Sequence, residues 1–203
     1  MSGTAKYDAA AERWSDEQYA DSAAYLSHRA SLVISLGPPL APGDTVLDLA
    51  CGDGGLVDFL PGIDYLGVDA DPKMVEEARS KGRAIVHADL NEFEPDAPVA
   101  ATTIFRAIYY SRDRGAFLRH VAGYTERKVV FDLNPRQYRL QEVTADLRAA
   151  GLTRISMRPF FVPQTHTLRR PLLRTAVALE RSGPLARLAL RYRFTYLIAA
   201  SRG

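Results

Sequence analysis

Residues 45–55 read TVLDLACGDGG, and this stretch decides the fold of the 203-residue chain. An apolar run rich in β-formers carries an acid, Asp48, near its end and then breaks into a glycine-rich turn. Helix-compatible residues follow until Pro61-Gly62. A buried strand that turns sharply into a helix places backbone N–H groups at the edge of a cleft, and glycine lets a ligand approach because it has no Cβ. The stretch therefore predicts a ligand site at the end of a strand.

Two further acids follow at nearly equal spacing. Asp69 lies 21 residues after Asp48, and Asp89 lies 20 residues after Asp69, each at the end of its own apolar run. In an open α/β sheet, ligands bind beyond the carboxyl ends of the strands. Asp69 is well placed for ribose hydroxyls, Asp89 could accept the exocyclic amine of an adenine, and Asp48 could pair with a cationic group. The three acids predict a nucleoside ligand that carries positive charge.

A phosphate-bearing ligand is the competing interpretation. Neither the dinucleotide pattern G-x-G-x-x-G nor the P-loop pattern is present after the strand. We also expect Asp53, inside the turn, to repel a pyrophosphate. An ordinary strand-to-helix turn with no ligand remains an alternative for the glycines alone, but it does not explain the three spaced acids.

Three motifs resemble those of the class I S-adenosylmethionine-dependent methyltransferases. Residues 46–54 (VLDLACGDG) look like the first motif of that family, residues 66–74 (LGVDADPKM) like the second, and residues 88–90 (ADL) like the third. The likeness extends more weakly to about Asn134. One departure is Ala50, where many members have glycine.

This resemblance implies a Rossmann-like fold and S-adenosyl-L-methionine (S-adenosylmethionine) as the cofactor. It implies that the first motif holds the methionyl part and that Asp69 takes the ribose. The adenine would lie beside residues of the second and third motifs. The cofactor-binding residues are then expected to be Asp48, Ala50, Gly52, Gly54, Asp69, Ala70, Met74, Asp89, Leu90 and Arg106.

Strand and helix patterns alternate along the chain and predict one α/β domain over residues 1–203. Because strands and helices alternate, we expect a doubly wound, mostly parallel seven-stranded sheet whose last strand is antiparallel. The predicted parts are an N-terminal helical flap (1–40), a cofactor-binding core (41–163), an insertion of two short helices (164–193) and a final strand (194–203). Strands are expected at 46–50, 65–68, 84–88, 99–105, 128–133, 154–162 and 194–200, and helices at 16–36, 55–60, 72–81, 115–124 and 138–150.

The candidate substrate-binding and catalytic residues lie in the predicted flap and in the loops after the fourth and fifth predicted strands. Methyl transfer from a sulfonium is an in-line substitution, so positioning can provide much of the rate and a base is needed only if the acceptor must lose a proton. Candidate catalytic residues are Tyr109, Tyr110 and His28, each with a structural role as the alternative. Candidate substrate-binding residues are Trp14, Tyr19, Asn134 and Arg136.

Composition limits the remaining possibilities. The formal net charge is only +2, but residues 164–203 hold eight arginines and one acid, Glu180. The basic surface could simply be solvated, or the insertion at 164–193 could be a lid, a homodimer surface or a weak contact with an anionic membrane surface. No nucleic-acid-binding motif, apolar run of membrane-spanning length or metal-ligand spacing is present in the sequence. We expect a cytoplasmic protein without a metal.

Three function classes remain open at this stage. The first is methyl transfer to a small-molecule acceptor, and the second is a non-catalytic module of the same fold that binds the cofactor or a partner. The third is an enzyme that keeps a dinucleotide in the same crevice. Thermal-shift comparison of S-adenosylmethionine with NAD separates the third from the others, and an acceptor panel separates the first from the second.

Overall fold

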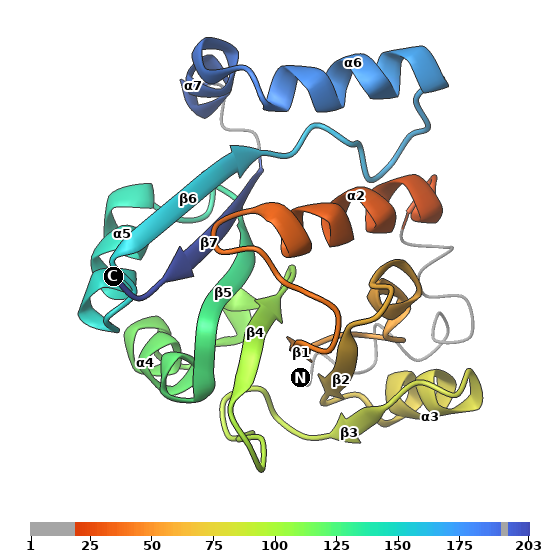
Figure 1. The fold of residues 1–203 in the computed structure, drawn as a ribbon, viewed down its shortest axis with the longest axis vertical. Helices are drawn as coiled ribbons and strands as arrows, with labels where there is room; N and C mark the ends of the chain where they lie inside the picture. The colour runs from red at the N-terminus through yellow and green to blue at the C-terminus, as the bar shows by residue number, and fades with distance from the viewer. Residues whose placement is uncertain (1–18, 192–194) are drawn as a thin grey trace.

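The computed structural model describes residues 19–191 and 195–203, which form a single seven-stranded sheet with the order β3-β2-β1-β4-β5-β7-β6 (Figure 1). Strands β1 to β5 run parallel, and β7 runs antiparallel between β5 and β6. The predicted fold class is thus confirmed. The strands are β1 (Thr45–Leu49), β2 (Asp64–Asp69), β3 (Ile85–His87), β4 (Val99–Ile104), β5 (Thr125–Leu133), β6 (Arg154–Pro159) and β7 (Tyr196–Ser201).

Three of the described helices begin at an aspartate that caps them, whereas two further helices begin without a side-chain cap. Asp71 is the N-cap of one helix and accepts a hydrogen bond from the Lys73 N–H at 2.9 Å, with Pro72 at the first helical position. Asp21 and Asp113 cap two others in the same way. The helices are α2 (Ser22–Ser35), α3 (Pro72–Ser80), α4 (Arg114–Tyr124), α5 (Leu140–Ala149), α6 (Arg170–Glu180) and α7 (Gly183–Arg191).

Two short elements differ from the sequence-based expectation. The segment predicted as a helix over 55–60 is a 3-10 helix, η3 (Gly55–Phe59), bounded by the left-handed Gly54 before it and by Pro61, which follows its C-cap Leu60. A second 3-10 helix, η4 (Ile108–Tyr110), occupies the loop after β4. The strand predicted over 154–162 ends at Pro159, and β5 begins three residues before its predicted start. Residues 1–18 of the predicted flap lie outside the described residues.

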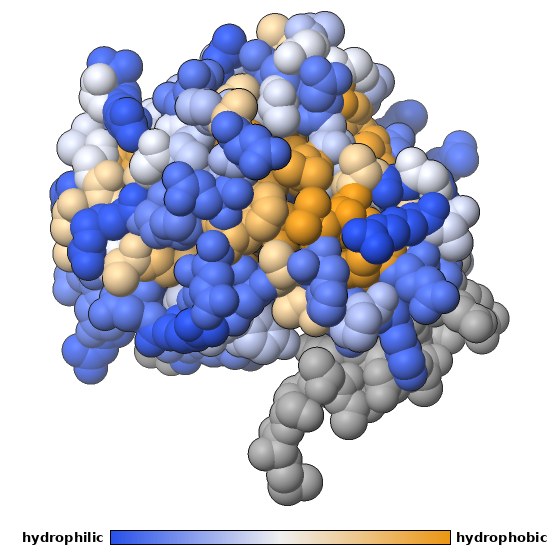
Figure 2. Space-filling model, turned by 90° about the horizontal axis from the view of Figure 1, so that it is seen from below, coloured by the Kyte–Doolittle hydropathy of each residue, from blue (hydrophilic) through white to orange (hydrophobic). Residues whose placement is uncertain are grey.

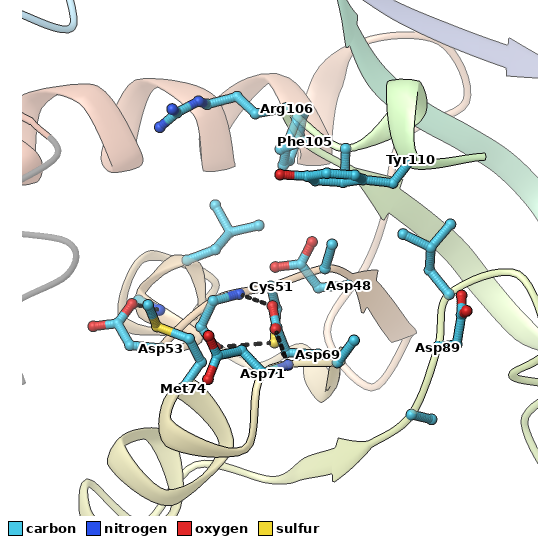
Figure 3. Close-up of a pocket in the computed structure, with 18 of the residues that line it drawn as sticks. Asp48, Cys51, Asp53, Asp69, Asp71, Met74, Asp89, Phe105, Arg106 and Tyr110 are labelled. Carbon is cyan, nitrogen blue, oxygen red and sulfur yellow. Dashed lines mark hydrogen bonds between the residues drawn. The ribbon is translucent and has the colours of Figure 1, made fainter. Parts of the chain in front are cut away.

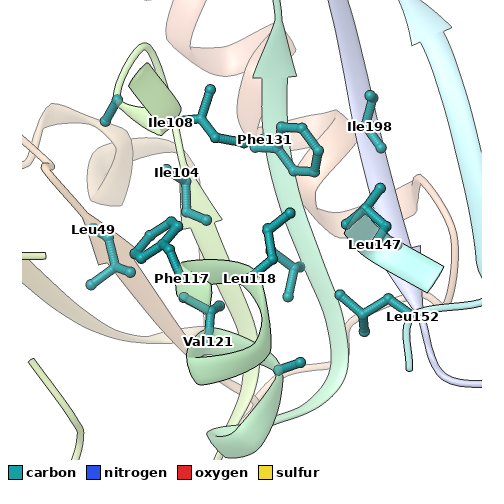
Figure 4. Close-up of a cluster of buried hydrophobic side chains, with 14 of the residues drawn as sticks. Leu49, Ile104, Ile108, Phe117, Leu118, Val121, Phe131, Leu147, Leu152 and Ile198 are labelled. Carbon is teal, nitrogen blue, oxygen red and sulfur yellow. The ribbon is translucent and has the colours of Figure 1, made fainter. Parts of the chain in front are cut away.

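Apolar side chains cover both faces of the sheet. One cluster joins the sheet to α4 and α5, and its members include Phe117, Leu118, Phe131 and Leu147 (Figure 4). A second cluster joins the opposite face to α2 and η3. Burial of this apolar area is the main source of stability. On the surface shown in Figure 2, hydrophobic residues gather in the middle of the face and hydrophilic residues surround them.

Helix α2 is fixed to the sheet by a buried cation. Lys128 of β5 is fully buried, and its Nζ donates hydrogen bonds to the carbonyl oxygens of Ile34 and Leu36, at 3.2 and 2.9 Å. These carbonyls belong to the last turn of the helix, where they have no partner within the helix and where a cation is favourable. Burial lowers the pKa of Lys128 to about 8. The interaction holds the C-terminus of α2 against the sheet.

Candidate cofactor and acceptor site

A cavity of about 410 Å³ lies at the carboxyl ends of β1, β2, β3 and β4, the edge of the sheet at which the sequence predicts a ligand site. Its volume is within the range of small-molecule sites. Figure 3 shows carboxylates and Met74 on one side and Phe105, Arg106 and Tyr110 on the other. The predicted residues that line it are Tyr19, Asp48, Ala50, Gly52, Asp69, Ala70, Met74, Asp89, Leu90, Arg106, Tyr109 and Tyr110.

Asp48, the residue before the last of β1, lies in a nearly closed environment. Its carboxylate accepts hydrogen bonds from the Thr103 hydroxyl at 2.6 Å and the Tyr65 hydroxyl at 2.9 Å, and the residue is 3% exposed. Burial raises the pKa of Asp48 to about 6, against the effect of these two hydrogen bonds. A buried carboxylate of this kind is stabilised in its charged form when a cation enters the cavity.

Asp69 holds the glycine turn in place. Its Oδ2 accepts the Gly52 N–H at 2.7 Å, and its Oδ1 accepts the Asp71 N–H at 2.9 Å. Burial raises the pKa of Asp69, although these backbone hydrogen bonds oppose the shift. Each carboxylate oxygen keeps a second lone pair, so the side chain can still accept hydrogen bonds from a ligand.

The turn itself requires left-handed backbone. Gly52 and Gly54 have φ values of 60° and 72°, which glycine adopts at no steric cost. Ala50 has φ 56°, a conformation that is unfavourable for a residue with a Cβ. The departure from glycine at this position thus preserves the turn but leaves it strained.

Asp53 does not present an isolated negative charge, contrary to the sequence-based argument against a pyrophosphate. Its Oδ2 lies 3.1 Å from Lys81 Nζ and 3.4 Å from Arg83 Nη1, and its Oδ1 accepts the Gly55 N–H. The two cations compensate its charge. Repulsion by Asp53 therefore no longer argues against a phosphate, and the exclusion of a dinucleotide rests on the missing glycine pattern.

Asp89, which follows β3, accepts hydrogen bonds from two neighbouring residues of the cavity wall. Its Oδ1 accepts the backbone and side-chain N–H groups of Asn91, and its Oδ2 pairs with Arg112 Nη2 at 2.7 Å. Slight desolvation is outweighed by the Asn91 hydrogen bonds and by Arg112, so the pKa of Asp89 is lowered. Asn91 and Arg112 also line the cavity, and the sequence analysis did not name them.

The loop after β4 forms the opposite wall. Tyr109 and Tyr110 are about half exposed, and their ring centroids lie 4.4 Å apart. Arg106 has a left-handed backbone, φ 55°, and its N–H donates to Asp132 Oδ1 at 2.6 Å. The Asp132 carboxylate therefore fixes the strained start of this wall.

Arg29 of α2 is the most unusual residue that the sequence analysis missed. It lines the cavity yet is only 2% exposed, and its Nη2 donates to Asp132 Oδ2 at 3.0 Å and to the Tyr25 hydroxyl at 2.8 Å. Its guanidinium carbon lies 4.2 Å from the centroid of the Phe105 ring. One signal was available, because Arg29 shares the apolar face of the helix with Leu26 and Val33.

Several predicted site residues do not line the cavity. His28 turns away from it, and its Nε2 lies 2.6 Å from Glu180 Oε2 of α6. Asn134 and Arg136 form a turn after β5, in which Asn134 Oδ1 accepts the Arg136 N–H at 3.0 Å. Gly54 supports the turn from behind without lining the cavity. Trp14 lies outside the described residues.

Comparison with known proteins supports the interpretation of the three motifs. Residues 46–128 match the family model described as a methyltransferase domain, which spans β1 to the beginning of β5. No curated protein matches the chain.

Solved structures share the fold across the whole chain. One is a chain from the complex between the Haloferax volcanii Trm112 methyltransferase activator and a methyltransferase, with 19% identity, TM-score 0.67, and coverage of 98% of this chain and 97% of that one. A second is a TehB-like S-adenosylmethionine-dependent methyltransferase from Corynebacterium glutamicum, with 14% identity, TM-score 0.65, and coverage of 98% and 99%. A third is magnesium protoporphyrin IX methyltransferase from Synechocystis PCC 6803 with bound S-adenosylmethionine, with 16% identity, TM-score 0.57, and coverage of 100% and 85%.

At such identities the structural likeness establishes the fold, while the family match and the motifs identify the domain. Residues 46–128 therefore match a methyltransferase domain, and the chain has the fold of the S-adenosylmethionine-dependent methyltransferases with which it is compared.

Proposed function

We propose that this protein transfers the methyl group of S-adenosylmethionine to a small-molecule acceptor. The observation that carries the proposal is the set of carboxylates, Asp48, Asp69 and Asp89, that three successive strands bring to one cavity beside the glycine turn. Their spacing and chemistry suit the cationic amino acid part, the ribose and the adenine of one ligand.

The residues of the carboxylate side divide the binding task. Asp48, next to the turn, faces the positively charged end of the ligand in a site of low polarity, where a charge pair is stronger than in water. Asp69 accepts ribose hydroxyls with the lone pairs that its backbone hydrogen bonds leave. Met74 and Leu90 provide apolar contacts for the adenine, and Asp89 accepts its amine.

The acceptor occupies the opposite side, beneath Phe105 and the tyrosine pair. The sulfonium is already a good leaving group, so the protein has mainly to hold the acceptor atom in line with the methyl group. Tyr109 and Tyr110 are positioned to orient an acceptor or to remove its proton. A cavity of about 410 Å³ suits a small molecule better than a folded macromolecule.

Calorimetry with S-adenosylhomocysteine tests the cofactor, and labelled S-adenosylmethionine with an acceptor panel tests the transfer. We expect submillimolar binding of S-adenosylhomocysteine and a larger thermal shift than NAD gives. A larger shift with NAD would contradict the proposal and favour a dinucleotide enzyme.

A second candidate is a module that acts together with a protein partner. It is favoured by one structural neighbour, which comes from a complex between a methyltransferase and its activator and matches nearly the whole chain. If the purified chain binds S-adenosylhomocysteine but transfers no methyl group to any acceptor until a partner from the same cell is added, this candidate replaces autonomous catalysis.

The α6–α7 hairpin, residues 170–191, is the proposed site of a weak contact with an anionic membrane surface. It exposes Leu172, Leu179, Leu185 and Leu188. Its one acid, Glu180, is buried against His28, so no carboxylate of the hairpin offsets the arginines at the surface. No described helix has the length and apolarity needed to cross a bilayer. We expect co-sedimentation with phosphatidylglycerol vesicles at low salt but not with phosphatidylcholine vesicles; equal recovery with both would contradict the contact.

A further inference from the structure

The charged side chains around the cavity are divided by sign. All the carboxylates that line it, at positions 48, 53, 69, 71 and 89, come from the β1, β2 and β3 ends and their turns. The lining cations are Arg29, Arg106 and Arg112, and Arg112 is paired with Asp89. Arg29 and Arg106 lie on the side of α2 and the β4 loop, and Arg29 is paired with Asp132, a carboxylate that does not line the cavity. A cationic ligand therefore fits one half of the cavity, and the other half favours an anion.

Arg29 has hydrogen-bonding capacity that the described residues do not use. Its Nη2 donates to Asp132 and to Tyr25, but among the described residues its buried Nε has no hydrogen-bond partner, and no hydrogen bond from Nη1 is found there either. An unsatisfied buried donor on a charged group is costly, and at a functional site a bound ligand, an ion or an ordered water can satisfy it.

The surroundings of the guanidinium indicate the shape of that ligand. Its central carbon lies 4.2 Å from the Phe105 ring centroid and 4.7 Å from that of Tyr25, so the guanidinium packs against two aromatic rings. Tyr19, which also lines the cavity, stacks on Tyr25 with centroids 4.4 Å apart. Guanidinium groups bind carboxylates in their own plane, and the rings of Tyr19 and Phe105, which line the cavity, suit a planar molecule.

We propose that Arg29 is the anion-binding residue of the acceptor subsite and that the acceptor is a planar, aromatic molecule with a carboxylate. This inference rests on the proposed function, since it places the acceptor beside the cofactor in the same cavity. Asp132 holds Arg29 through one oxygen and the Arg106 N–H through the other, so it couples the anion site to the wall that carries the tyrosine pair.

The test uses benzoate as the probe and neutral benzamide as its isosteric control, on the full chain saturated with S-adenosylhomocysteine. The Nε–H signal of Arg29 is followed by ¹H–¹⁵N NMR and assigned through its contacts with the Phe105 ring. We expect benzoate to shift this signal and benzamide to leave it unchanged. This titration uses the unaltered protein and does not depend on any variant folding.

A variant pair gives the second readout. Arg29→Lys keeps the charge next to Asp132 but removes the planar donors, so benzoate should bind about tenfold more weakly or worse, while S-adenosylhomocysteine binds as before. Arg148→Lys, at an exposed position on α5, is the matched control and should leave benzoate binding unchanged.

The outcomes separate the two proposals. Benzoate that does not move the Arg29 signal, or that binds Arg29→Lys as tightly as the unaltered protein, overturns the anion subsite while cofactor binding stands. If S-adenosylhomocysteine itself does not bind, the proposed function fails. The anion subsite is then tested on the ligand-free protein, by whether benzoate moves the Arg29 signal and whether it binds Arg29→Lys more weakly.

Discussion

Replacing Asp48 with asparagine should stabilise the protein at neutral pH while weakening the cofactor site. Burial raises the pKa of Asp48 from its ordinary value of 3.8 to about 6. The folded state therefore binds this proton more tightly than the unfolded state. The stabilising contribution of the neutral carboxyl is fully present below about pH 4 and is lost as the pH rises through about 6. Asparagine keeps the shape and never ionises, so it escapes this loss.

The size of the effect follows from the shift. About two pKa units correspond to about 3 kcal/mol over the full range, of which about 2 kcal/mol develops between about pH 4.5 and pH 7.5. For a chain of this size, 1 kcal/mol moves Tm by about 2–4 °C. Asp48→Asn should thus gain about 4–8 °C relative to the unaltered protein between these two pH values. A constant offset is also expected, because one of the hydrogen bonds from Thr103 and Tyr65 must reverse its direction.

Thermal unfolding of both proteins across this pH range measures the difference directly. Asp96→Asn, which removes an exposed carboxylate, controls for the loss of one negative charge. A difference in Tm that stays constant with pH would refute the burial argument. Calorimetry on the same samples should show weaker S-adenosylhomocysteine binding by Asp48→Asn, and binding by the unaltered protein that strengthens as the pH rises through about 6. Equal affinity of the two proteins at pH 7.5 would remove Asp48 from the site.

Three further predictions concern the turn, the ribose site and the helix anchor. Ala50→Gly should raise the free energy of unfolding by about 0.5–1 kcal/mol, because it relieves a left-handed φ of 56°; denaturant unfolding showing a loss would contradict this. Asp69→Ala should weaken S-adenosylmethionine binding by about 1.5–3 kcal/mol and also lower Tm, since two backbone N–H groups lose their acceptor; unchanged calorimetric affinity would exclude its ribose role. Lys128→Met should abolish a rise in stability with pH. The folded-state pKa of Lys128, about 8, lies below the ordinary value of 10.5, so the unaltered protein gains stability between these pH values. If the free energies of unfolding of the two proteins change in parallel with pH, the argument is disproved.

Local sequence patterns were sufficient for the sheet and for the carboxylate side of the cavity. Asp48, Asp69 and Asp89 each end an apolar run, and parallel strands bring such ends to one edge. The glycine turn and the caps depend on the backbone preferences of neighbouring residues, which a sequence displays directly. The type of the short helix η3 does not follow from the sequence, because five residues cannot establish a helical period.

The acceptor side depends on contacts between distant segments. Arg29 meets Asp132, 103 residues away, and His28 meets Glu180, 152 residues away, so no local pattern predicts either pair. Its position in the predicted flap makes His28 a candidate base, whereas in the structure Glu180 of α6 pairs with it outside the cavity. An arginine on the apolar face of a helix was the one visible sign of a buried charge. Asp132 lies near the carboxyl end of β5, so it fits the same pattern of acids at strand ends that identified the other carboxylates.

A crystal structure with S-adenosylhomocysteine tests the central claim most directly. The account predicts the ligand in the cavity, with its ribose hydroxyls within hydrogen-bonding distance of Asp69, its amino acid part beside Asp48 and the glycine turn, and its sulfur facing Phe105 and the tyrosine pair. Density for the ligand at any other place, or a ribose that does not reach Asp69, would contradict it.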